Sequence, residues 1–84
     1  MNQPFFGRSA CVATMPSMTL AFKAEKTLTA VGIPCEIISL LPGESKRGCA
    51  YGLLFACETE RRVRALLRGA HIPVSQYLKR GIQS

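Results

Sequence analysis

Four cysteines, at positions 11, 35, 49 and 57, are the residues of this chain best suited to chemistry. Cys49 has a setting that the other three lack. It follows a loop that carries Lys46, Arg47 and Gly48, and it opens an apolar run that ends at position 56. Neighbouring cations stabilise a thiolate, which is the nucleophilic form of cysteine. The sequence therefore predicts that Cys49 is a reactive thiol and that Lys46 and Arg47 stabilise its thiolate.

The other cysteines are better explained as structural residues. Cys11, Cys35 and Cys57 lie in or beside apolar segments, where free cysteine commonly packs as a small hydrophobic residue. The N-terminal segment has no clear signal-peptide core, and no apolar run approaches the roughly 20 residues of a membrane span. We therefore expect a cytoplasmic protein whose thiols stay reduced, although four cysteines would allow three disulfide pairings.

Several other kinds of site are disfavoured by the composition. The chain has no Cys-x-x-Cys pair and a single histidine, His71, so we predict no metal site. It has no aspartate for a Ser-His-Asp triad and no Walker or Rossmann glycine motif. We expect neither a cofactor nor an enzymatic activity.

The net charge of +6 favours an anionic partner, because eleven Lys and Arg residues face only five acidic ones. The densest basic cluster is Arg61, Arg62, Arg64 and Arg68. On a helix these residues form either a solvated face or a surface that docks a partner. The charge alone does not choose between nucleic acid, anionic membrane and acidic protein.

Six elements are expected in the order βαββαβ. The predicted strands are 9–15, 33–41, 49–56 and 72–78, and the predicted helices run from a Ser17 N-cap to about residue 31 and from a Thr59 cap to residue 69. Residues 1–8 are expected to form an arm, residues 9–79 one domain and residues 80–84 a tail. The order predicts a ferredoxin-like α+β sandwich, with an antiparallel sheet and both helices on one face.

This topology would give Cys49 a second activating group. Right-handed crossovers place the third strand between the first two, antiparallel to the first. Its start then lies at the end of the sheet where the first helix begins, so the free amides after Ser17 would also stabilise the Cys49 thiolate. Two orientations of the strand remain open. Either Tyr51, Leu53 and Phe55 belong to the core, or they form an exposed apolar patch suited to a homodimer or a protein partner.

RNA binding is a competing interpretation, because the RNA recognition motif shares this size and topology. Its third-strand signature matches residues 47–54 only in part. Cys49 stands where the first stacking aromatic belongs, and the strand at 9–14 supplies no aromatic residue. We therefore consider nucleic-acid binding the less favoured alternative. A protein-interaction domain with purely structural cysteines is a further one.

Several short motifs resemble those of small selenium/sulfur (Se/S) carrier-like domains. They are an Ala-x-Lys-Ala-Glu pattern in a Ser-led helix at 17–26, a Gly-Ile-Pro step at 32–34, and a loop with Pro42 and Glu44 that leads to Cys49. Gly43 and Ala50 differ from the Arg and Gly of the family pattern. The resemblance implies a carrier in which Cys49 accepts sulfur or selenium, as a persulfide or selenosulfide, from a donor protein and passes it to an acceptor protein.

Overall fold

A computed structural model describes residues 9–44 and 48–81. The elements are β1 (Ser9–Met15), α1 (Met18–Thr29), β2 (Cys35–Ser39), β3 (Tyr51–Ala56), the short 3-10 helix η2 (Cys57–Thr59), α2 (Glu60–Gly69) and β4 (Gln76–Gly81). The predicted order βαββαβ is confirmed, with η2 as an added turn before the second helix. Lys46 and Arg47 lie outside the described residues.

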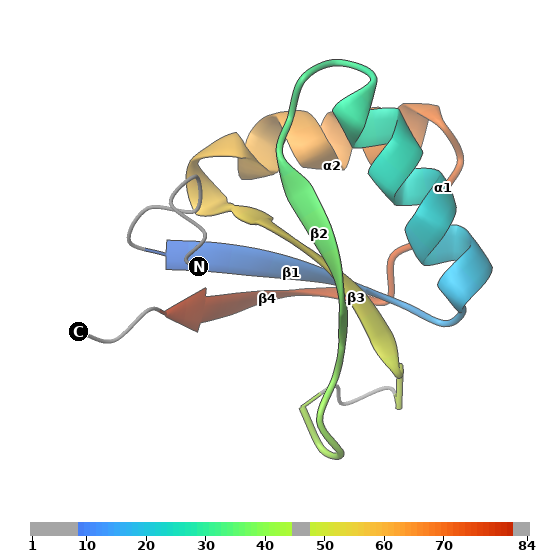
Figure 1. Ribbon diagram of the computed structural model, residues 1–84, viewed down its shortest axis with the longest axis vertical. Coiled ribbons are helices and arrows are strands. Elements are labelled where there is room, and N and C mark those ends of the chain that lie inside the picture. The colour runs from blue at the N-terminus through green and yellow to red at the C-terminus, as the bar shows by residue number, and fades with distance from the viewer. Residues whose placement is uncertain (1–8, 45–47, 82–84) are drawn as a thin grey trace.

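The four strands form one antiparallel sheet in the order β2-β3-β1-β4 (Figure 1). β3 lies between β1 and β2, as predicted, and both helices cover the same face of the sheet. The predicted α+β sandwich is therefore confirmed. Pairing of Met15 with Tyr51 and of Ala10 with Ala56 sets the register. The start of β3 thus lies at the end of the sheet where β1 ends and α1 follows.

The core lies between the sheet and the helices. Alternation along β3 directs Leu53 and Phe55 toward the helices, where both are fully buried and Tyr51 packs beside them. The opposing residues are Ala21, Ala24 and Leu28 of α1 and Val63 and Leu67 of α2. Of the two orientations left open by the sequence, the core assignment is correct. The apolar patch that would have favoured a homodimer does not form from these residues.

The opposite face of β3 bears Gly52, Leu54 and Ala56. A Cβ atom at Gly52 would lie 2.5 Å from Cγ1 of Val12 on β1, so only glycine fits at this position without a shift of its neighbour. In the described parts of β1 and β3, every residue on this face is aliphatic, glycine or threonine. On this face, β1 and β3 therefore present none of the aromatic residues on which RNA bases would stack.

Three strands begin later than predicted. β2 begins at Cys35 rather than at residue 33. β3 begins at Tyr51, so Cys49 lies just before the strand and does not open it. β4 begins at Gln76 rather than at residue 72. The reason is that Ile72 completes the end of α2, where its amide donates to the carbonyl of Leu67 at 3.0 Å and its side chain is buried.

Of the two predicted helix caps, one is confirmed and one is wrong. Ser17 caps α1 as expected, because its Oγ accepts a hydrogen bond from the amide of Leu20 at 3.2 Å. Thr59 precedes α2 but does not cap it. Its hydroxyl instead donates to the carbonyl of Ala56 at 2.7 Å and closes the η2 turn.

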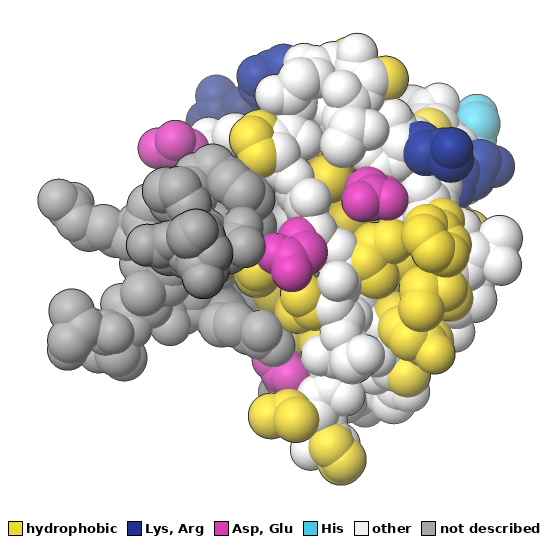
Figure 2. All heavy atoms as spheres, viewed as in Figure 1, with side chains coloured by type: hydrophobic (Ala, Val, Ile, Leu, Met, Phe, Trp, Pro, Cys, Tyr) yellow, Lys and Arg dark blue, Asp and Glu magenta, His cyan; other side chains and the backbone are white. Residues whose placement is uncertain are grey.

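Some large hydrophobic side chains remain on the surface. Met18 and Phe22 of α1 are 37% and 51% exposed, and Leu41 in the β2–β3 loop is 71% exposed. Figure 2 shows hydrophobic side chains gathered on the face that carries α1 and at the tip of the loop. Within the described residues, no helix is long and apolar enough to cross a membrane.

Candidate functional site

The Cys49 thiol lies at the end of the sheet where β1 ends. Its side chain is half-buried, and its Sγ donates a hydrogen bond to Oγ of Ser75 at 3.1 Å. These two residues come from separate loops, 26 positions apart, that meet beside the start of β3. The sequence-predicted thiol is thus placed next to a hydroxyl group that the sequence analysis did not identify.

The β2–β3 loop positions Cys49 from one side. The amide of Leu40 donates to the carbonyl of Ala50 at 2.9 Å, and this bond extends the hairpin by one pair beyond the strands. Gly48 has a φ of 75°, in the left-handed region that favours glycine. This glycine turns the chain immediately before the cysteine. A residue with a Cβ atom would strain the turn.

Ser75 is held by β1. Its amide donates to the carbonyl of Thr14 at 2.8 Å. The Thr14 hydroxyl then accepts from the amide of Gln76 at 3.1 Å and donates to the carbonyl of Gln76 at 3.2 Å. Thr14 is fully buried, and its hydrogen bonds to Gln76 are partly buried. The network fixes the segment that presents Ser75 to the thiol.

A hydroxyl group can serve both protonation states of the thiol. It accepts the hydrogen bond of the thiol, and after a rotation it donates to the thiolate. Ser75 was missed because the last strand was predicted to begin at residue 72, which placed Ser75 within a regular strand. To recognise Ser75 from the sequence, one would have to know which residue of β4 pairs with Thr14 of β1.

The predicted activating groups have different positions. The N-terminus of α1 and Cys49 lie at the same end of the sheet, as expected from the register of Met15 and Tyr51. The hydroxyl of Ser17 is engaged with the Leu20 amide as a cap. Lys46 and Arg47 belong to the part of the loop that the structure does not describe, so their role as thiolate-stabilising residues stays a prediction.

The predicted docking arginines are all exposed on α2, but their environments differ. Arg64 forms an ion pair with Glu60 at 2.7 Å, and its guanidinium lies 4.1 Å from the ring centroid of Tyr77. Arg61 and Arg62 belong to the first turn of α2, at the opposite end of the sheet from Cys49. Arg68 lies in the last turn. The structure therefore does not bring the arginines together with the thiol into one compact site, and their role in docking stays a prediction.

Cys35 is poorly suited to act as a nucleophile. Its Sγ lies 3.9 Å from the carbonyl oxygen of Glu25 on α1. Burial, and secondarily the negative charge of Glu25, raise the pKa of the Cys35 thiol to about 11. At neutral pH this thiol stays protonated.

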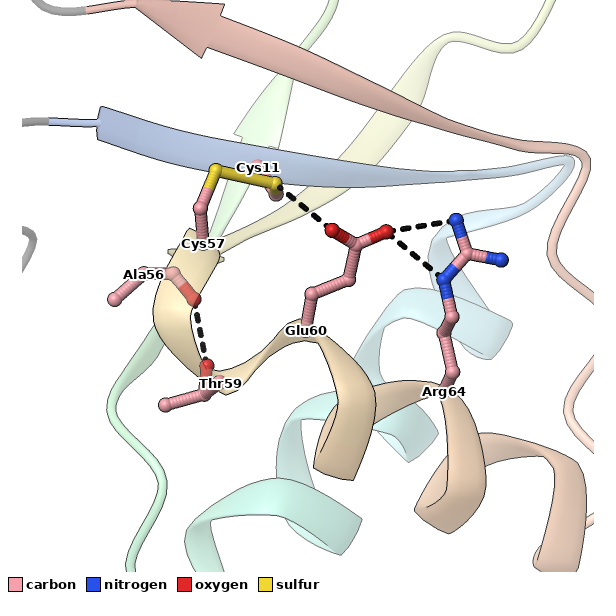
Figure 3. The surroundings of a disulfide bond; sticks show 6 residues. All are labelled: Cys11, Ala56, Cys57, Thr59, Glu60 and Arg64. Atoms are coloured by element: carbon pink, nitrogen blue, oxygen red, sulfur yellow. Dashed lines mark hydrogen bonds and ion pairs between the residues drawn. A yellow bond between two sulfur atoms is a disulfide. The ribbon is translucent and has the colours of Figure 1, made fainter.

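Cys11 and Cys57 form a disulfide bond, so the expectation that these thiols are reduced is wrong. Cys11 pairs with Phe55 across β1 and β3, and Cys57 lies two residues after Phe55, so both side chains leave the same face. Their Cα atoms are 5.0 Å apart, within the range that a disulfide can bridge. The amino-acid composition does not show which residues of β1 and β3 lie opposite one another, so the disulfide could not be predicted from it. Figure 3 shows the bond beneath β1, with Glu60 directed toward it from the first turn of α2.

The described residues contain no group of three or more His, Cys, Asp or Glu side chains that could hold a metal ion. Cys49 and Ser75 lie at one end of the sheet, and the disulfide lies at the other.

A family model described as "Putative Se/S carrier protein-like" matches residues 10–79. Searches of curated proteins and of solved structures found no match. The family match runs from the second residue of β1 into β4 and includes Cys49 and Ser75. The chain therefore belongs to the Se/S carrier protein-like family.

Proposed function

We propose that the protein carries sulfur or selenium on Cys49, as a persulfide or selenosulfide, and passes it to a partner protein. The observation that carries the proposal is the hydrogen bond between the half-buried Cys49 thiol and Ser75 at the loop end of the sheet. A carrier requires an accessible thiol with local stabilisation, and it needs no enclosed substrate pocket. Family membership supports the same role.

The chemistry is a pair of sulfur exchanges. The Cys49 thiolate attacks the terminal sulfur of a donor persulfide, the donor thiolate leaves, and Cys49 then bears the persulfide. A thiolate of the acceptor attacks the terminal sulfur of Cys49, and the Cys49 thiolate is released. Each step forms one bond to sulfur and breaks one, so no oxidant is required. The Ser75 hydroxyl donates to the thiolate in the states before loading and after release.

Partner proteins must reach the end of the molecule that holds Cys49. The exposed side chains of Met18 and Phe22 lie on the first half of α1, which begins at that end. An apolar partner surface would cover them while it approaches the thiol. We propose that Met18 and Phe22 form a docking surface for a partner protein. The arginines of α2 would contact a larger partner in addition. Exchange of this kind would take place in the cytoplasm, the location predicted from the sequence.

RNA binding is less well supported. On β3 the aromatic side chains Tyr51 and Phe55 pack toward the helices, so they are not available for stacking on the opposite face of the sheet. The basic charge would still attract nucleic acid, but without a stacking platform the attraction would lack base contacts.

Loading can be tested by intact-mass analysis after incubation with a cysteine desulfurase and cysteine. The wild type should gain the mass of one sulfur atom at Cys49, and Cys49→Ser should gain none. Cys35→Ser is the matched control and should load like the wild type, because the Cys35 thiol stays protonated at neutral pH. Ser75→Ala should load about tenfold more slowly, since it removes one hydrogen bond to a charged group.

Equal loading of Cys49→Ser and the wild type would contradict the assignment of the site. Absence of loading in both would contradict the carrier role. Unchanged loading of Ser75→Ala would show that the hydroxyl group only packs against the thiol.

A further inference from the structure

The two cysteines of the disulfide differ in exposure. Cys11 lies on β1 under α2, and 2% of its surface is exposed. Cys57 lies in the η2 turn at the edge of the core and is partly exposed. Of the two residues, Cys57 is therefore the one that an external thiol can approach more readily. Thiol–disulfide exchange requires such access.

A carboxylate contacts the buried sulfur. Oε1 of Glu60 lies 3.7 Å from Sγ of Cys11, and Oε2 of the same carboxylate is paired with Arg64 at 2.7 Å (Figure 3). When the disulfide is reduced, the Cys11 thiol can donate its proton to this oxygen in a hydrogen bond. The negative charge of Glu60 also disfavours a Cys11 thiolate. Both effects stabilise a protonated Cys11 in the reduced protein.

An open depression adjoins the exposed sulfur. It is lined by Cys57, Glu58, Glu60, Arg61, Arg62 and Arg64. Glu60 and Arg64 neutralise one another, which leaves two arginines against Glu58. The net positive charge beside Cys57 favours the approach of an anionic thiol.

We propose that Cys11–Cys57 is an exchangeable disulfide and that anionic thiols, such as glutathione, reduce it through Cys57. A thiolate attacks Sγ of Cys57, the Cys57–Cys11 bond breaks, and the Cys11 thiolate leaves and is protonated from water. A second thiolate then attacks the sulfur of the bound thiol, which releases the Cys57 thiolate and the oxidised thiol. Two thiols are oxidised, and one protein disulfide is reduced to a dithiol.

The folded sheet can persist through this reaction. β1 pairs with β3 from Ala10 to Met15 and with β4 from Ser9 to Thr14, and these ladders do not depend on the disulfide. Reduction would release only the link between β1 and the turn that leads into α2. The exchange would thus be a property of the native protein and would act apart from Cys49, which lies at the other end of β3.

The test uses the oxidised Cys49→Ser variant, so that the proposed carrier thiol cannot contribute. The folded protein is incubated with 2-mercaptoethanesulfonate, an anionic thiol, quenched with acid, and alkylated after unfolding. Intact mass should show the number of alkylated cysteines rising from one to three, while circular dichroism stays native. A disulfide that resists the thiol until the protein is unfolded by urea would overturn the proposal.

Two further variants locate the attacked sulfur. In Cys11→Ser, glutathione disulfide should form a mixed disulfide with the free Cys57 of the folded protein. In Cys57→Ser, the buried Cys11 should form none until unfolding. The reverse pattern would overturn the assignment to Cys57. The measurement on the intact disulfide needs neither variant, so it remains decisive if one of them does not fold.

A matched pair of arginine variants tests how positive charge affects reduction of the disulfide. Arg62→Gln removes a charge beside Cys57, and Arg68→Gln removes one from the far end of the same helix. Arg62→Gln should slow reduction by 2-mercaptoethanesulfonate about threefold relative to Arg68→Gln, with little effect on reduction by neutral 2-mercaptoethanol. Equal rates in the two variants would contradict the preference for anionic thiols.

Discussion

At the scale of single residues, the four cysteines have three different chemical settings. Cys49 is half-buried beside a hydroxyl group, Cys35 is held protonated, and Cys11 and Cys57 are joined. The loop composition identified Cys49 as a candidate. The disulfide was not predictable, because it depends on the register of two strands far apart in the sequence.

Alkylation should distinguish Cys49 from Cys35, the two cysteines outside the disulfide. Thiolate is the reactive form, and the raised pKa of Cys35 leaves only about one thousandth of this side chain ionised at pH 8. Peptide mapping after treatment with iodoacetamide at pH 8, without reductant, should therefore find the label on Cys49 and almost none on Cys35. As the pH rises toward 11, labelling of Cys35 should increase steeply, because a raised pKa moves ionisation to higher pH. Labelling of Cys35 at pH 8 as fast as Cys49 would contradict this account.

At the scale of elements, both helices end in the same way. After α1, Gly32 adopts a φ of 83°, and the amide of Ile33 donates to the carbonyl of Leu28. After α2, His71 takes the equivalent position with a φ of 59°, and the amide of Ile72 donates to Leu67. Both are Schellman motifs, in which a left-handed residue turns the chain and a buried isoleucine follows. The sequence predicted that Gly32 ends the first helix. It did not predict that His71 adopts the left-handed conformation at the end of the second.

The left-handed positions predict opposite effects of two substitutions. His71→Gly should raise the free energy of unfolding by about 0.5 to 1 kcal/mol, because glycine adopts this conformation without steric cost. Gly32→Ala should lower it by about 1 kcal/mol, although no atom lies within 4 Å of the added Cβ. Urea denaturation of the oxidised proteins measures both changes. A loss of stability in His71→Gly would show that its side chain contributes more than its backbone conformation costs.

At the scale of the whole molecule, β3 separates two sulfur sites. From Tyr51 to Ala56 the strand spans about 17 Å, with Cys49 before it and Cys57 after it. A partner that docks over the start of α1 would therefore leave the disulfide open to small thiols. This separation allows loading of Cys49 and exchange at Cys57 to be measured independently.

Most of the architecture was predictable from hydrophobic periodicity. The order of elements, the antiparallel hairpin of β2 and β3, and the position of β3 beside β1 all followed from patterns and from the handedness of crossovers. The start of β4 was not predictable, because Ile72 belongs to the end of α2 by a hydrogen bond that the pattern does not reveal. Ser75 was missed for the same reason. Of the two residues of the candidate site, Cys49 was thus identified from the local sequence, and Ser75 required the tertiary structure.

The proposed carrier function requires that Cys49 both accepts and releases one sulfur atom. A mass-spectrometric time course follows both steps: the protein is first loaded with a cysteine desulfurase and cysteine, then separated from the donor and mixed with excess 2-mercaptoethanol. The wild type should gain one sulfur atom on Cys49 and return to a sulfur-free mass, whereas Cys49→Ser should stay unloaded throughout. Sulfur that loads on another cysteine, or that stays on Cys49 after the thiol is added, would contradict the carrier function.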